Sequence, residues 1–290
     1  MTGQSRLVAG IDLGPETVQV VSYAALFATA MHASVRLLYV IDYLLTPPSY
    51  LAEYIEEEKK REESEVAGWG ARLREAGVNA EYGIIMGRLH ESFLKVIEET
   101  APSLLVTGFK SHLFRPSSSE RLIKSLKVPV LVVKGKAAAG AAIGLVSVKR
   151  ILCPVDFSES SRKAVVAARQ YASLFSAALQ LVHIIPTQCI KEKGHLWKRL
   201  RQEDRVTFDT AMRSEAESTL ASFCKEMKIE GEGEIYEGLP GEVISSLAEE
   251  GRYDLIIVGA RGLSYVKSVL VGGTTEAVLK SSPCPVLIIH

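Results

Sequence analysis

Residues 150–177 read RILCPVDFSESSRKAVVAARQYASLFSA, and residues 6–33 read RLVAGIDLGPETVQVVSYAALFATAMHA. Each stretch opens with a short apolar run that ends at an aspartate, Asp156 in one and Asp12 in the other. The two aspartates lie 156 − 12 = 144 positions apart, and the segments that follow, SVRLLYVID and ALQLVHIIP, match at the same offset. Similarity at a fixed spacing is the signature of an internal repeat. The sequence therefore predicts a duplicated pair of similar domains.

The rest of the chain continues the repeat with slightly larger offsets. MGRLHESFLKVIEE from Met86 matches EGLPGEVISSLAEE from Glu237, and LLVTG matches LIIVG, both at an offset of 237 − 86 = 151. SERLIKSLKVPVLVV from Ser119 matches TEAVLKSSPCPVLII from Thr275. Between the copies lies GKAAAGAAIGLVS, which is small, Gly/Ala-rich and poor in charge, as linkers are. The predicted boundaries are a first domain at 1–136, a linker at 137–148 and a second domain at 149–290.

Apolar runs alternate with helix-like segments throughout the second copy. We expect five strands, at 151–156, 179–185, around Ile235, at 254–260 and at 285–290. Helical patterns lie between them, and Ser158 to Ser161 offers capping groups for the first helix. Alternating strands and helices favour a parallel sheet with helices on both faces. The predicted fold class is α/β, with two tandem doubly wound domains of five parallel strands each.

Composition narrows the classes of function. Lys+Arg and Asp+Glu both number 34, so there is no net positive charge to favour a nucleic acid. No apolar run reaches the roughly 20 residues of a membrane span, and a cytoplasmic protein is expected. The four cysteines show no C-x-x-C spacing, which favours small buried side chains over disulfides or metal ligands. The histidines likewise lack metal spacing, and no metal site is predicted.

One glycine-rich segment has a pattern that points to chemistry. Residues 259–278 read GARGLSYVKSVLVGGTTEAV, directly after the fourth predicted strand and before a helix. Glycine permits close backbone approach, and the first turn of a helix offers unpaired N–H groups to a phosphate. In open parallel sheets, ligands bind beyond the carboxyl ends of the strands. A phosphate-binding loop is predicted, and a plain strand–loop–helix turn is the alternative.

The spacing G-x-x-G-x9-G, together with CPVDFSE and the closing PVLII strand, resembles the universal stress protein family over nearly the whole chain. The resemblance implies an adenine-nucleotide-binding fold, a role in stress response and dimerisation through the last strand. It implies ATP, ADP or AMP as ligand, with or without Mg²⁺. The residues it implies around the nucleotide, in order from base to phosphates, are Pro154, Val155, Asp156, Ile184, Val258, Gly259, Gly262, Gly272, Gly273, Thr274 and Thr275. Arg261, between the first two glycines, could also point at the phosphates. One departure is Gly273, where the family usually has Ser or Thr. Arg261 could equally be a solvated loop residue.

The first copy departs further from the family pattern. From Gly108 it reads GFKSHLFRPSSSERL, with Ser111 at the second glycine and Pro116 where Gly272 would stand. Gly108 to Glu120 spans 120 − 108 = 12 positions, whereas Gly259 to Glu276 spans 276 − 259 = 17. Five residues of the loop are missing, and proline removes a backbone donor. The first site is therefore predicted to be degenerate, although Asp12 and Val40 persist.

Three functions are compatible with these patterns. The first is a regulatory module whose second domain holds an adenine nucleotide, with no catalytic residues. In this hypothesis VPVLVV pairs with CPVLII in an intramolecular pseudo-dimer, and two chains associate further. The second is a slow ATPase that uses Asp156 and Arg261. The third is a nucleotide-free interaction protein. Two further features have plain interpretations: His183 is expected to be a packed strand residue, and the basic segment from Lys191 is either a helix start or a lid.

Overall fold

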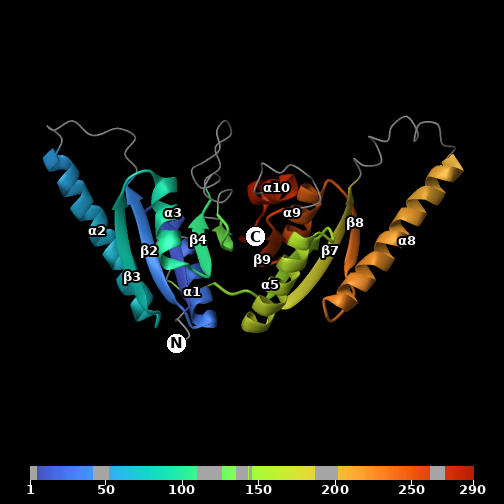
Figure 1. The fold of residues 1–290 in the computed structure, drawn as a ribbon, viewed down its shortest axis with the longest axis horizontal. Coiled ribbons are helices and arrows are strands. Elements are labelled where there is room, and N and C mark those ends of the chain that lie inside the picture. Colours follow the sequence, from blue (N-terminus) through green and yellow to red (C-terminus); the bar gives the residue numbers. More distant parts are fainter. Residues whose placement is uncertain are drawn as a thin grey trace. The chain divides into compact units, whose positions relative to one another are not determined.

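The computed structural model describes residues 5–41, 52–109, 126–134, 143, 146–186, 202–261 and 272–290. The chain divides into two compact units, Met1–Ser147 and Val148–His290. Figure 1 shows that each unit contains a sheet with helices packed against it. Among the described residues, no helix is both long and apolar enough to span a membrane.

Strands and helices alternate in the first unit. In chain order its elements are β1 (Arg6–Ile11), α1 (Thr17–Met31), β2 (Ser34–Ile41), α2 (Ala52–Glu75), β3 (Ala80–Met86), α3 (Leu89–Thr100), β4 (Leu104–Gly108) and β5 (Val130–Val133). The strands lie in the order β3-β2-β1-β4-β5. Every pair in this sheet is parallel.

The second unit repeats this order. Its elements are β6 (Arg150–Val155), α5 (Glu159–Phe175), β7 (Ala178–Pro186), α8 (Gln202–Glu226), β8 (Glu234–Gly238), α9 (Pro240–Glu250), β9 (Leu255–Gly259), α10 (Gly273–Ser281) and β10 (Val286–Ile289). The strands lie in the order β8-β7-β6-β9-β10, and all their pairs are parallel. The predicted fold class is thereby confirmed, and the offsets of 144 and 151 reappear in the bounds of β1 and β6 and of β4 and β9.

The core of the second unit forms because β6, β9 and β10 are nearly continuous aliphatic runs. Ile151, Leu152, Leu255, Ile256 and Leu287 are fully buried. Strands with this composition need helices on both faces to exclude water. On one face the side chains of Arg162 and Glu226 join α5 to α8 in an ion pair. On the other, the hydroxyl groups of Ser245 and Ser281 lie 2.6 Å apart and join α9 to α10.

The direction in which the chain adds strands to the sheet of the second unit reverses at one position. From β6 the chain moves outward to β7 and β8, and it then returns to β9 on the other side of β6. Crevices at such reversals lie beyond the carboxyl ends of the strands. In this unit the crevice lies where β6 and β9 end, at Val155 and Gly259.

Candidate functional site

The loop that follows β6 is fixed by short-range hydrogen bonds. The Asp156 carboxylate accepts a hydrogen bond from the Ser158 backbone N–H at 3.1 Å. Ser158 caps α5, because its hydroxyl oxygen accepts from the Ser161 N–H at 3.2 Å. Phe157, between them, has a positive φ of 63°. This tight turn holds the Asp156 carboxylate at the end of the strand, as the sequence predicted for that position.

Gly259 ends β9 where that strand passes close to α5. A Cβ atom added to Gly259 would lie 2.5 Å from the Ser160 hydroxyl oxygen and 2.7 Å from the Ser160 carbonyl group. No larger residue fits there unless α5 moves. The Arg261 N–H donates to the same hydroxyl at 3.2 Å. The glycine at this position therefore serves close packing rather than an unusual φ.

The α10 helix begins earlier than its apolar pattern indicated. Its first residue is Gly273, so Gly273, Thr274 and Thr275 form the first turn instead of preceding the helix. The Gly272 N–H donates to the Ala260 carbonyl at 2.7 Å and holds the helix start beside the end of β9. The buried Thr275 hydroxyl donates to the Gly259 carbonyl at 2.9 Å. Its proton is therefore used within the protein, whereas Thr274 is exposed.

These segments enclose a cavity of about 280 Å³. All the site residues predicted from the sequence line it, except Gly262, which lies outside the described residues. Its apolar walls include Val155, Ile184 and Val258, which are 4–6% exposed. Ile244 and Pro240 on α9, with Pro186 and Ser161, also line the cavity and were not predicted. A right-handed crossover from β8 to β9 places α9 over this crevice, which is the signal that could have identified them.

Negative and positive groups line the cavity at the ends of different strands. Asp156 stands at the end of β6, and Arg261 and the first turn of α10 stand at the end of β9. A helix N-terminus carries a partial positive charge and N–H groups without intrahelical partners. Near Arg261, burial together with the charges of Arg261 and Lys163 lowers the pKa of His290 to about 4. The imidazole of His290 is therefore neutral at pH 7.

His183 on β7 is half-buried and lines the cavity, whereas the sequence predicted a packed strand residue. Its Nδ1 lies 2.8 Å from the Val155 carbonyl oxygen, which can only accept, so Nδ1 carries the proton. Its ring lies 4.5 Å from the Phe157 ring, and Phe157 in turn lies 5.4 Å from Phe223 on α8. Cys153, Cys224 and Cys284 are buried and free, and burial raises the pKa of the Cys153 thiol. Cys189 lies outside the described residues.

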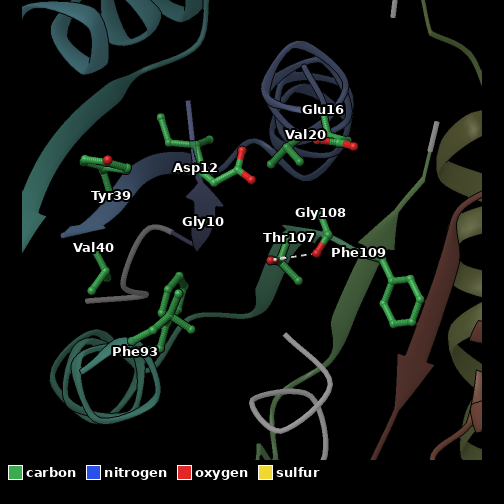
Figure 2. Close-up of a pocket in the computed structure, with 12 residues that line it drawn as sticks. Gly10, Asp12, Glu16, Val20, Tyr39, Val40, Phe93, Thr107, Gly108 and Phe109 are labelled. Atoms are coloured by element: carbon green, nitrogen blue, oxygen red, sulfur yellow. Dashed lines mark hydrogen bonds between the residues drawn. The ribbon is translucent and has the colours of Figure 1, made fainter. Parts of the chain in front are cut away.

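The first unit has a smaller cavity of about 200 Å³ at the equivalent place. Figure 2 shows Asp12 at the end of β1, Val40 and Phe93 together on one side, and Glu16 and Val20 on α1. The Asp12 carboxylate accepts from the Gly14 N–H at 2.9 Å. Asp12 and Val40, predicted to persist, do line this cavity.

Several predicted features lie outside the described residues. They are the shortened loop of the first copy with Ser111, Pro116 and Glu120, the long loop of the second copy with Gly262, and the basic segment from Lys191. The proposed degeneracy of the first loop therefore stays a prediction from the sequence.

Fold and site together define a protein of two α/β units, each with a ligand-sized cavity at the carboxyl ends of its parallel strands. Comparison with known proteins identifies the family, since residues 4–134 and 147–290 each match the Universal stress protein family. The chain belongs to this family as a tandem member.

Three known proteins show what the chain is similar to. Universal stress protein MJ0577 of Methanocaldococcus jannaschii is 30% identical over 152 residues, which cover 49% of this chain and 94% of the relative. A universal stress protein structure from Archaeoglobus fulgidus covers 98% of this chain and 96% of its own, with 20% identity and a TM-score of 0.70, and so shares its fold. A universal stress protein solved in complex with cAMP is 23% identical over 50% of this chain and 98% of its own, with a TM-score of 0.34.

Proposed function

We propose that the second unit binds an adenine nucleotide and that the protein acts as a nucleotide-dependent regulatory module. The observation that carries the proposal is the combination of surfaces in one cavity. Apolar walls, a carboxylate and a helix N-terminus line the same cavity, and these three surfaces suit the base, the sugar and the phosphates of a nucleotide.

The apolar slot suits a purine base. Ile184, Ile244 and Val258 are nearly inaccessible to solvent, and each presents aliphatic surface to the cavity. Covering both faces of a planar ring with such side chains removes its apolar surface from water. Pro154 adds a rigid wall, and it is the residue before Val155 at the end of β6.

The Asp156 carboxylate suits the ribose hydroxyl groups. Its Oδ1 accepts from the Ser158 N–H, and an ionised carboxylate has about four lone-pair sites. A carboxylate with this acceptor capacity suits a pair of neighbouring hydroxyl donors. The carboxylate also repels phosphates, which favours their placement at the far end of the cavity.

The start of α10 suits the phosphates. Gly273 and Thr274 are exposed in the first turn, and a Cβ atom added to Gly273 would meet nothing within 4 Å. Backbone N–H groups at such a position bind anions without a side chain. Arg261 adds a positive charge at the same end. Mg²⁺ would be held by the phosphates of ATP or ADP rather than by a dedicated protein site.

Calorimetric titration of the purified chain with ATP, ADP and AMP tests the proposal. Binding at or below millimolar ligand is expected, and the paired change Gly272→Val, Gly273→Val should abolish it by filling the space before α10. Gly68→Val is the matched control, because a Cβ atom there also meets nothing within 4 Å. Absence of binding for all three nucleotides at millimolar concentration would overturn the proposal.

The same samples address the slow-ATPase alternative. Phosphate release above background that disappears in Asp156→Ala would make the protein an enzyme, whereas a trace rate unchanged by this substitution would not. The pairing of VPVLVV with CPVLII, and further association of two chains, remain proposals from the sequence.

A further inference from the structure

The turn that carries Asp156 holds its middle residue in a conformation that side chains rarely adopt. Phe157 has a φ of 63°, in the left-handed region that favours glycine. With this φ the Ser158 N–H points at the Asp156 carboxylate, which accepts its hydrogen bond. A change of Phe157 to a negative φ would rotate that N–H away from the carboxylate. The orientation of Asp156 is therefore linked to the conformation of Phe157.

An aromatic cluster packs against the Phe157 side chain. The centroid of its ring lies 4.5 Å from that of His183 on β7, and 5.4 Å from that of Phe223 on α8, which meets it edge to face. Phe223 is 3% exposed, and the Arg162 guanidinium lies 5.0 Å from its ring centroid. Arg162 also pairs with Glu226 on α8. These contacts from a strand and two helices can offset the free-energy cost of the left-handed backbone.

The cluster is connected to the wall of the cavity as well as to the turn. His183 lines the cavity, and its Nδ1 donates to the carbonyl of Val155, the residue directly before Asp156. Phe157 is not one of the lining residues. Its ring can therefore influence a bound ligand only through the residues that it holds in place.

The first unit has the same turn without this cluster at the equivalent positions. Leu13 corresponds to Phe157, since 157 − 144 = 13, and its φ is 56°. In both turns the aspartate accepts a hydrogen bond from the N–H two residues further on. Tyr39 corresponds to His183, and its hydroxyl donates to Glu62 on α2 at 2.8 Å. The left-handed residue thus belongs to the turn in both copies, whereas the stacked rings belong to the second.

We propose that Phe157 is a positioning residue whose ring, held by His183 and Phe223, keeps the Asp156 carboxylate oriented toward the ribose hydroxyl groups of the nucleotide. This inference rests on the nucleotide binding proposed above for the second unit. It adds a residue that sets how strongly the site distinguishes ribose from a sugar without hydroxyl groups. Loosening the turn should weaken this distinction and leave the contacts with base and phosphates in place.

Calorimetric titration with ATP and with 2′,3′-dideoxy-ATP measures the distinction. The unmodified protein should bind ATP at least about tenfold more tightly, because hydrogen bonds to a carboxylate are strong. Asp156→Ala should bring the ratio of the two affinities close to one. Phe157→Ala should reduce the ratio by about fivefold or more, with the affinity for dideoxy-ATP changed by less than about twofold.

Phe157→Gly separates positioning from a simple loss of packing. Both variants lose the ring, but glycine adopts a left-handed φ without the cost that alanine retains. The ATP preference should therefore be about threefold larger in Phe157→Gly than in Phe157→Ala. A role in packing alone predicts equal losses or the reverse order. Phe175→Ala, which removes a ring stacked on Tyr171 at the other end of α5, is the matched control and should keep the full preference.

Exchange of the Ser158 N–H, followed by NMR without nucleotide, reports on the turn itself. It should be about tenfold faster in Phe157→Ala than in the unmodified protein. Phe157→Leu keeps an apolar side chain and removes only the aromatic contacts, so it replaces Phe157→Ala if that variant does not fold.

The possible failures are distinguishable. Absence of binding of either nucleotide to the unmodified protein overturns the proposed function and this inference with it. Three results overturn the inference alone: equal binding of ATP and dideoxy-ATP to the unmodified protein, full ATP preference in the folded Phe157 variants, or unchanged Ser158 exchange in them.

Discussion

Gly259 and Gly273 belong to the same glycine-rich segment but meet different constraints. A side chain at Gly259 would overlap the backbone of Ser160, which cannot move without shifting α5. A side chain at Gly273 would enter open space at the first position of α10, and the backbone φ there is not positive. One glycine is therefore required by packing, and the other is open to substitution.

The contrast predicts opposite results for two small substitutions. Gly259→Ala should destabilise the protein by about 1–3 kcal/mol, as overpacking commonly does. Gly273→Ser should leave stability within about 0.5 kcal/mol. It should also tighten nucleotide binding about two- to tenfold by adding one hydroxyl contact. Urea unfolding and calorimetry measure the two effects, and weaker nucleotide binding by a folded Gly273→Ser protein would argue against phosphates at α10.

At the scale of a single element, α5 connects the candidate site to the core. Its cap, Ser158, shares the turn with Asp156, and Ser161 behind the cap lines the cavity. The equivalent helix of the first unit, α1, starts at Thr17, and the residue before it, Glu16, makes no side-chain capping hydrogen bond. The position of the Asp156 carboxylate therefore depends on how firmly the first turn of α5 is held.

Removing this cap should loosen the turn. Ser158→Ala is expected to lower the stability of the protein by about 1 kcal/mol, with faster hydrogen exchange in peptides that cover α5. Ser158→Asn should preserve most of the stability, because its side chain can accept the same hydrogen bond. Unchanged exchange in Ser158→Ala would show that the cap does not hold the turn.

At the scale of the whole molecule, duplication has produced two units with the same strand order and different cavities. Among the described lining residues, Phe93 and Glu16 belong to the first cavity, while Ile244 and the first turn of α10 belong to the second. The described linings of the two cavities therefore differ.

This asymmetry predicts one adenine nucleotide per chain at saturation. Native mass spectrometry of the protein with ATP should show a single bound nucleotide, and calorimetry should give a stoichiometry near one. Two nucleotides per chain, with the second one retained in the Gly272→Val, Gly273→Val variant, would contradict the asymmetry.

The sequence by itself determined the duplication, the α/β fold class and the order of the elements. These follow from local patterns: the periodicity of apolar residues distinguishes β6 or β9 from α5, and parallel strands must end at the same edge. The positions of Asp156, Gly259 and Gly272 around one cavity follow from this edge, because each stands where a strand ends or a helix starts. The exact ends of the elements did not follow from these patterns, since α10 begins before its apolar pattern does.

Only the tertiary structure decided which contacts these residues make. The ring of Phe93 rests on Gly10, and Gly259 lies against Ser160, although each pair is far apart in the sequence. The Thr275 hydroxyl, expected to face phosphate, donates to the Gly259 carbonyl instead. Such contacts depend on the packing of helices over the sheet, and periodicity along one segment carries no information about the side chain that lies across from it. Local pattern thus defined where the cavities lie, and long-range packing defined their shape and charge.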